Sequence, residues 1–170
     1  MNNAEFEVSV AAAIARLHAA MAKVANGDVS AIKELYSQTA DATSFYGWGG
    51  YEKGAAAVSK RWDWAGSQFK GGTVRYENVS TVATPEMFYV TDIETFEDQR
   101  VAGVGGVTGW SNRVTHIFRR EAGEWRLVHR HGNRRKRNTS PPPNWRNDAS
   151  LEAGGKSLEC GVRPQRVAAG

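Results

Sequence analysis

The stretch from Arg113 to Gly132 constrains the fold most, and it reads R-V-T-H-I-F-R-R-E-A-G-E-W-R-L-V-H-R-H-G. It predicts a β-hairpin, because its second arm alternates in character at every residue. Strand side chains point to opposite faces in turn. One face would carry Trp125, Leu127, His129 and His131, and the other would carry Arg126, Val128 and Arg130. We expect the face that begins with Trp and Leu to be buried, with the two imidazoles where the core opens into a pocket.

The first seventy residues show helical periodicity. A first helix is expected over residues 8–26, and a short second helix follows it around Ile32, Leu35 and Tyr36. Residues 41–51 predict a strand that runs into a glycine-rich turn. A third helix is expected from Gly54, with an apolar stripe made of Val58, Trp62, Ala65 and Phe69.

After Gly71-Gly72 the period changes to two, which is typical of strands. Strands are expected over residues 73–83, 87–97, 103–120 and 124–131. Helices gathered early and strands gathered late predict an α+β fold. In it, a curved antiparallel sheet would wrap around three helices and bury one of its faces.

Charge is distributed unevenly along the 170 residues. Residues 1–132 carry a net charge of −1, whereas residues 133–170 carry +5 and include the block Arg134-Arg135-Lys136-Arg137. We therefore expect one domain over residues 1–133 and a basic tail, rich in Pro and Gly, over residues 134–170. The basic block could bind nucleic acid or an acidic surface, but such blocks are more often solvated, and the domain itself lacks the charge excess of a nucleic-acid-binding groove.

The sequence also bears on the cellular compartment. It has no run of 18 apolar residues that could span a membrane, and its N-terminus is acidic where a secretory signal is basic. The single cysteine, Cys160, cannot form an internal disulfide. We expect a cytoplasmic protein with no membrane partner.

Four segments together resemble one known family. They are N-G-D-V-S-A-I-K-E-L-Y-S (26–37), F-Y-G-W-G-G-Y-E-K-G-A-A-A-V (45–58), N-R-V-T-H-I-F-R-R (112–120) and E-W-R-L-V-H-R-H-G (124–132). In this order they resemble the bacterial SnoaL-like and ketosteroid-isomerase-like branch of the nuclear-transport-factor-2-like superfamily, over residues 8–132. The resemblance implies a cone-shaped α+β barrel with a deep pocket, a homodimer packed through the outer sheet face, and a small apolar organic ligand. Reactions vary widely in this superfamily, so the fold does not name one.

The candidate catalytic residues are His131, His129 and Asp92. Two imidazoles on one strand face could act as general acid or base near neutral pH, although one of them could simply cap the core. A His-x-His pair also suits a metal, with Asp92 or Glu94 as a third ligand, but without a clear third ligand we expect none. Asp92 and Glu94 share a face with Phe88, Val90 and Phe96. That face lines the pocket or forms the outer surface, and the pattern does not decide between them.

The candidate substrate-binding residues are Tyr46, Trp48, Trp62 and Arg113. The aromatic residues would form a pocket wall with hydroxyl donors, and Arg113 could bind an anionic group. The alternatives are a core position for Trp62 and a solvated position for Arg113, which lies opposite His116 on its strand.

These observations favour an isomerase, cyclase or dehydratase that needs no cofactor and uses His and Asp acid–base chemistry on an apolar carbonyl or hydroxyl compound. The alternative is a ligand-binding or oligomer-assembly module without catalysis.

Overall fold

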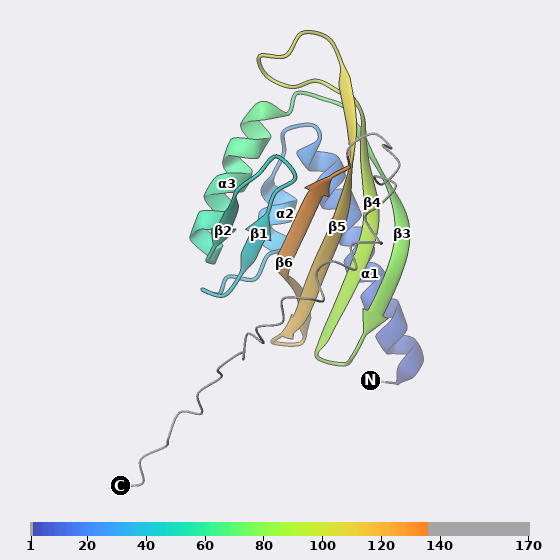
Figure 1. The fold of residues 1–170 in the computed structure, drawn as a ribbon. Coiled ribbons are helices and arrows are strands. Elements are labelled where there is room, and N and C mark those ends of the chain that lie inside the picture. Colours follow the sequence, from blue (N-terminus) through green and yellow to red (C-terminus); the bar gives the residue numbers. More distant parts are fainter. Residues whose placement is uncertain (1, 136–170) are drawn as a thin grey trace, which may run out of the picture. The chain divides into compact units, whose positions relative to one another are not determined.

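The computed structural model of the chain describes residues 2–135. Along the chain the elements are α1 (Asn3–Val24), α2 (Ser30–Leu35), β1 (Thr43–Phe45), β2 (Tyr51–Lys53), α3 (Ala55–Gln68), β3 (Thr73–Ala83), β4 (Met87–Gln99), β5 (Thr108–Glu121) and β6 (Glu124–Arg134) (Figure 1). The predicted tail beyond Arg135, with Cys160, lies outside the described residues, so the predicted domain boundary stays a prediction.

The strands form one six-stranded sheet in the order β2-β1-β6-β5-β4-β3. Neighbouring strands are antiparallel except for the pair β1 and β6, which is parallel. The sheet is curved and does not close on itself, and the helices lie on one side of it (Figure 1). The predicted α+β class, with three N-terminal helices on a curved sheet, is confirmed.

Helix α1 begins five residues before the predicted start at Val8. Asn2 caps it: its side-chain oxygen accepts a hydrogen bond from the backbone N–H of Glu5, and the Glu5 carboxylate accepts one from the N–H of Asn2. This reciprocal capping box satisfies helix donors that would otherwise be free. The apolar stripe alone could not show where the helix starts.

The glycine-rich segment forms two short strands where the sequence predicted one. Residues 46–50 turn the chain between β1 and β2, and Gly49 and Gly50 both have positive φ angles there. Strand β1 also pairs in parallel with β6, opposite His129 to His131. This pairing fixes the segment against the end of the sheet.

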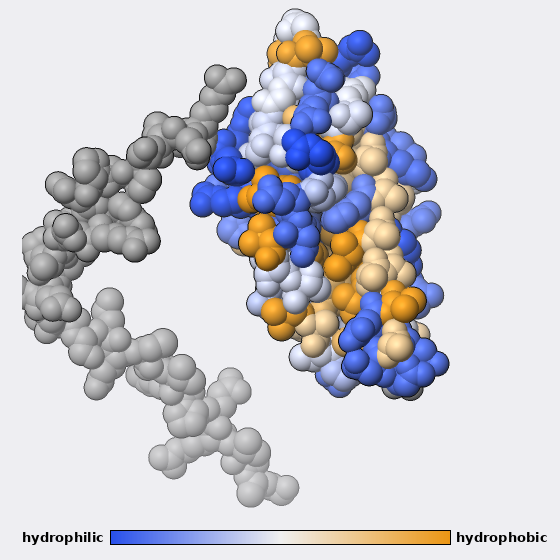
Figure 2. Space-filling view, turned by 90° about the vertical axis from the view of Figure 1, so that its right-hand side faces the viewer, coloured by the Kyte–Doolittle hydropathy of each residue, from blue (hydrophilic) through white to orange (hydrophobic). Residues whose placement is uncertain are grey.

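Three aromatic side chains pack together in the core near the turns that join β3 to β4 and β5 to β6. The Phe88 ring stacks on Phe118 at a centroid distance of 4.5 Å, and Trp125 meets Phe88 edge-on at 4.9 Å. All three side chains are buried. The side of the molecule formed by α1 and β3 mixes hydrophobic and hydrophilic residues (Figure 2). Among residues 2–135, no helix is long and apolar enough to cross a membrane.

A β-bulge in β6 overturns the predicted alternation of the final strand. Leu127 pairs with Phe118, but the next pair joins His129 to Ile117, so Val128 is an extra residue. An extra residue in one strand reverses the facing of every side chain after it. Arg130 therefore points into the core, where it is 4% exposed, whereas His131 is exposed on the other face. The prediction that His129 and His131 share the buried face of Trp125 and Leu127 is wrong.

Candidate functional site

A buried ion pair lies at the centre of the inner sheet face. The Arg130 guanidinium, on β6, donates to Glu94 Oε2 on β4 at 2.7 Å, and both side chains are almost fully buried. Asn112 donates to the same oxygen at 3.0 Å, and the Tyr76 hydroxyl donates to Oε1 at 2.8 Å. Burial alone would lower the pKa of Arg130, but the charge of Glu94 and the hydrogen bond to it raise that pKa above its usual value. Arg130 is thus held in its charged form beside Glu94.

The imidazole of His116 lies beside this pair. Its Nε2 is 2.6 Å from Nη1 of Arg130. A guanidinium can only donate, so Nε2 accepts, and a neutral ring then carries its proton on Nδ1. Burial, followed by the charge of Arg130, lowers the pKa of His116 well below the usual value for histidine. His116 is therefore neutral, and its Nδ1–H is buried without a hydrogen-bond partner among residues 2–135.

Asp92 and His18 form a second pair on the same side of the sheet. Asp92 Oδ1 accepts a hydrogen bond from Asn78 at 2.9 Å, while Oδ2 lies 3.5 Å from Nε2 of His18. Neither of these last two atoms has a hydrogen bond within the described part of the chain. The His18 ring stacks on Tyr76 at a centroid distance of 3.8 Å, and its side chain is 29% exposed. This pair thus joins a buried carboxylate to an imidazole that reaches solvent.

Four further polar groups reach the same interior from β1 and the helices. They are the side-chain hydroxyls of Tyr36, Ser44 and Tyr46 and the indole N–H of Trp62, and all four are buried. None has a partner at full hydrogen-bond geometry within residues 2–135, but Ser44 and Trp62 lie close enough to Tyr36 to lower its pKa by hydrogen bonding, and Ser44 acts on Tyr46 in the same way. Burial raises the pKa of Tyr36 and of Tyr46, so both hydroxyls keep their protons at neutral pH. The charge of Arg130 acts on both tyrosines, and its guanidinium lies 6.0 Å from the Trp62 ring. The interior therefore holds a cluster of protonated hydroxyls that bond only loosely to one another beside the charge of Arg130.

An aromatic cavity of about 300 Å³, here called the mouth cavity, lies between the C-terminal part of α3 and the connection from β4 to β5. Trp48, Trp64, Phe69 and Trp110 line it, together with Arg134. Trp48 stacks on Tyr46 at 5.1 Å, and Tyr46 in turn meets Trp62 edge-on at 5.9 Å. A continuous row of aromatic rings thus links this mouth cavity to the buried interior.

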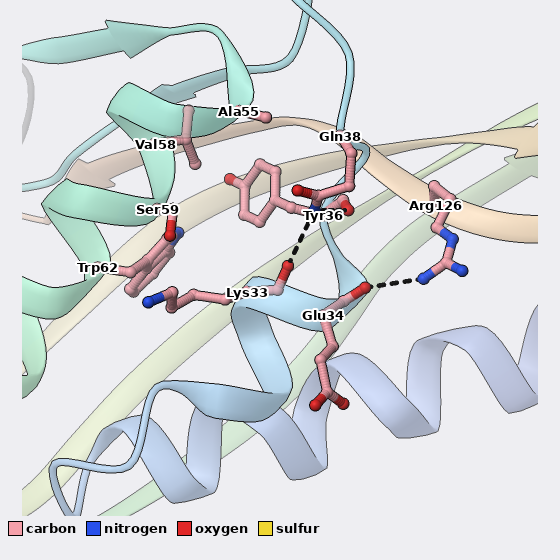
Figure 3. A pocket seen from close by; sticks show the side chains of 9 residues that line it. All are labelled: Lys33, Glu34, Tyr36, Gln38, Ala55, Val58, Ser59, Trp62 and Arg126. Carbon is pink, nitrogen blue, oxygen red and sulfur yellow. Dashed lines mark hydrogen bonds between the residues drawn. The ribbon is translucent and has the colours of Figure 1, made fainter.

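A second cavity, of about 520 Å³, lies between α2 and α3 (Figure 3). Tyr36 and Trp62 are among the residues that line it, and the Glu34 carboxylate points away from both of them, toward α1. Arg126 donates to the Glu34 carbonyl oxygen at 2.8 Å. Tyr36 and Trp62 therefore stand between this outer groove and the interior.

The structure divides the residues predicted from sequence between two faces. Tyr46 and Trp62 lie in the interior, and Trp48 lines the mouth cavity. The Asp92 side chain points inward, and so does that of Glu94, which settles which face of β4 lines the interior. Arg113 lies on the outer face, where it donates to Asn133 at 3.3 Å.

His129 and His131 also lie on the outer face of the sheet, with ring centroids 6.4 Å apart. His129 Nδ1 is 2.8 Å from the Thr43 hydroxyl, and both imidazoles pack near Phe45. The sheet separates them from the carboxylates of Asp92 and Glu94, so the metal ligand set considered from sequence does not assemble. No cluster of metal-ligating side chains occurs within residues 2–135.

Three residues of the interior site, His18, His116 and Arg130, were not predicted from the sequence patterns. A signal existed for His18: it lies four residues after Ile14 and three before Met21, within the apolar stripe of α1. A signal for Arg130 existed as well: if the face of β4 that carries Glu94 is buried, that carboxylate needs a cationic partner. Which cation would pair with it depended on the bulge, for which the sequence carries no local signal.

The chain belongs to the SnoaL-like domain family, whose model matches residues 10–133. No curated protein has a significant sequence match to it. Among solved structures, it is similar to a ketosteroid isomerase-like protein from Erwinia carotovora atroseptica, with 19% identity, a TM-score of 0.65, and coverage of 80% of this chain and 100% of that one.

Two other solved structures are similar to the chain. One is labelled a dehydratase of the nuclear transport factor 2-like family, from Streptomyces avermitilis, with 18% identity, a TM-score of 0.61, and coverage of 76% and 95% of the two chains. The other is labelled a calcium/calmodulin-dependent protein kinase type II association domain, from Thiobacillus denitrificans, with 16% identity, a TM-score of 0.62, and coverage of 74% and 94%. At these identities the likeness establishes the fold.

Proposed function

We propose that the chain binds a small organic carbonyl or hydroxyl compound in its interior and transfers protons on it. One observation carries this proposal: Asp92 Oδ2 and His18 Nε2 face each other at 3.5 Å without forming a hydrogen bond, and His116 Nδ1 is buried without a partner in the described part of the chain. Unpaired buried polar groups cost stability, so a purely structural network would be expected to pair them. A bound molecule with oxygen atoms would do so.

The three groups have complementary roles in this proposal. Asp92 acts as the base through Oδ2, because Asn78 already occupies Oδ1. His18 takes the proton from Asp92 and passes it to solvent through its exposed edge. His116, held neutral by burial and by Arg130, donates a hydrogen bond from Nδ1 to a substrate oxygen and keeps its proton. A positioned base beside hydrogen-bond donors for the substrate oxygen removes the proton next to a carbonyl, and the protonated carboxyl of Asp92, in exchange with solvent through His18, returns a proton to the substrate.

The hydroxyls of Tyr36 and Tyr46 would hold the substrate oxygen. Both are protonated donors, and Arg130 adds a positive charge nearby. Donors placed around a developing negative charge stabilise it most strongly where water is excluded. Tyr46 thus keeps the binding role expected from sequence, whereas Arg113, His129 and His131 have none in this proposal.

The neighbours labelled ketosteroid isomerase-like and dehydratase are consistent with such chemistry. A second candidate function is an assembly or binding module, in line with the neighbour labelled an association domain. It is favoured by the Glu94 carboxylate, because both of its oxygens already accept hydrogen bonds from protein groups.

In either case we propose a homodimer formed through the outer sheet face, where Met87 and Tyr89 are exposed. Sedimentation velocity tests this dimer separately from the chemistry.

The proton transfer can be tested without knowing the natural substrate. The protein is incubated in D₂O with a panel of small ketones, aldehydes and hydroxy ketones, and loss of the proton next to the carbonyl is followed by proton NMR. We expect exchange of at least one compound, and a general base contributes about 10²- to 10⁴-fold, so Asp92→Asn should slow that exchange by at least about 10²-fold.

His131→Ala is the matched control, because it removes a titratable group from the opposite face of the sheet. It should exchange the same compound at the wild-type rate. Equal rates in Asp92→Asn and the wild type, or loss of exchange in the His131 variant, would contradict the proposal. Absence of exchange across the panel would favour the assembly module.

A further inference from the structure

The mouth cavity carries a chemical signature of its own. Its lining is mainly aromatic and apolar: Trp48, Trp64, Phe69, Val101, Val104 and Trp110. Trp48 and Trp64 lie 5.9 Å apart between ring centroids, and each remains 40% or more exposed. Large aromatic surfaces left open to solvent around a concavity are typical of binding sites for flat apolar groups.

One arginine, Arg134, lines this cavity, and a second, Arg61, lies over the ring of the lining residue Trp64. The Arg61 guanidinium lies 4.3 Å from the centre of the Trp64 ring and 5.4 Å from that of Tyr46. The Arg134 guanidinium lies 5.4 Å from the centre of the Trp110 ring. Stacking on an indole orients a guanidinium and leaves its in-plane N–H donors free to bind a planar anion.

Neither arginine forms an ion pair with a carboxylate of the described residues. The arginines 75, 119, 126 and 130 each form an ion pair with an acidic side chain, but none joins Arg61 or Arg134 to one within residues 2–135. Nε of Arg61 is moreover buried without a hydrogen-bond partner there. Within the described part of the chain, the cavity is thus lined by one guanidinium without an ion pair and by no acidic side chain, and a second such guanidinium lies on its Trp64.

We propose that the mouth cavity binds a flat aromatic molecule that carries an anionic group, with the aromatic body against Trp48, Trp64 and Trp110, the anion held by Arg134, and the charge of Arg61 on Trp64 adding to the attraction. Charge-assisted bonds from guanidinium to a planar anion are about twice as strong as neutral ones. This inference goes beyond proton transfer in the interior and does not require it, because it concerns binding alone.

A matched pair of probes tests the charge requirement. The dye 8-anilinonaphthalene-1-sulfonate is anionic, and N-phenyl-1-naphthylamine has the same aromatic skeleton without the sulfonate. Binding of each to the full chain is followed by dye fluorescence at low and at high salt. We expect one sulfonate dye per chain, bound at least fivefold more tightly than the neutral dye, with affinity that falls as salt rises.

Variants locate the site. Arg61→Gln and Arg134→Gln should each weaken the anionic dye about fivefold to tenfold and leave the neutral dye within twofold. Trp64→Leu should weaken both dyes. The control is Arg113→Gln, which removes an exposed arginine without an ion pair from the outer face and should change neither affinity. Melting temperatures verify that each variant is folded.

Three results would overturn the inference: equal affinity for the two dyes, no effect of either mouth arginine on the anionic dye, or an equal effect of Arg113→Gln. As a second readout, the indole N–H resonances of Trp64 and Trp110 should shift on addition of the anionic dye. Shifts confined to other tryptophans would place the dye elsewhere. Because these measurements use no turnover, they fail or succeed independently of the deuterium exchange test.

Discussion

The Arg130 guanidinium and the Glu94 carboxylate lie 2.7 Å apart, and both are buried on the inner face of the sheet. Each group depends on the other, since an isolated buried charge is costly. We expect Arg130→Met to destabilise the fold by about 3–5 kcal/mol, because it leaves Glu94 buried and unpaired. Urea unfolding of Arg130→Met, Glu94→Gln and the double variant measures this. The double variant should be more stable than Arg130→Met, and a loss equal to the sum of the single losses would show that the two residues do not interact.

Deleting Val128 should damage the fold more than any conservative change at that position. Without the extra residue, His129 and His131 would turn inward and Arg130 would turn outward, leaving Glu94 without its partner. We expect the deletion to abolish cooperative thermal unfolding, whereas Val128→Ile should melt within a few degrees of the wild type. A deletion variant with a wild-type melting temperature would mean that the strand does not need its bulge.

Gly47 is packed against the polar cluster and should not tolerate a side chain. A Cβ at this position would lie 2.8 Å from Asn112 Oδ1, whose amide nitrogen binds Glu94. We expect Gly47→Ala to cost about 1–3 kcal/mol through this overpacking. Gly105→Ala is the control, because no atom lies within 4 Å of a Cβ there. Equal unfolding free energies for both variants would contradict the close approach.

Stability should fall in mild acid because of His116. In the folded protein the pKa of His116 is well below the usual histidine value. Below about pH 6.5, the ordinary histidine pKa, His116 therefore becomes protonated in the unfolded chain but stays neutral in the folded one. The stabilising contribution is therefore complete above that pH. It is lost at about 1.4 kcal/mol per pH unit as the pH falls toward the folded pKa.

The difference between variants isolates this contribution from that of other groups. Unfolding free energies of wild type and His116→Gln are compared at pH 7.5 and pH 5.5. The wild type should lose more stability on acidification than His116→Gln does. His131→Asn is the control and should lose about as much as the wild type. A wild-type pH dependence in His116→Gln would show that His116 is protonated normally in the fold.

The sequence was sufficient to predict the α+β class, the family and the helical faces. Val58, Trp62 and Ala65 form the buried side of α3, and β3 has the predicted bounds, because periodicity depends only on local geometry. The alternation on β4 also placed Asp92 and Glu94 together correctly. Deciding that their face is the inner one required knowing which side of the sheet the helices cover.

The site itself could be predicted only in part. Strand alternation is interrupted at one residue, Val128. This interruption turns the Arg130 side chain to the inner face and the His129 and His131 side chains to the outer face. The pairings of Asp92 with His18 and of Glu94 with Arg130 join segments 74 and 36 positions apart, so no local pattern reveals them. Tertiary packing selects such pairs, whereas sequence shows only that each group needs a partner.

The most direct test of the account is a pH titration of the four histidines by nitrogen-15 NMR, which reports the protonation state and tautomer of each ring. The account places His116 inside the sheet against Arg130, and His129 and His131 outside. It predicts that His116 stays neutral, with its proton on Nδ1, at pH values well below 6.5, and that His18→Gln perturbs its signals more than His131→Asn does. A His116 that titrates near pH 6.5, or that responds to His131→Asn instead, would contradict this arrangement and the interior site built on it.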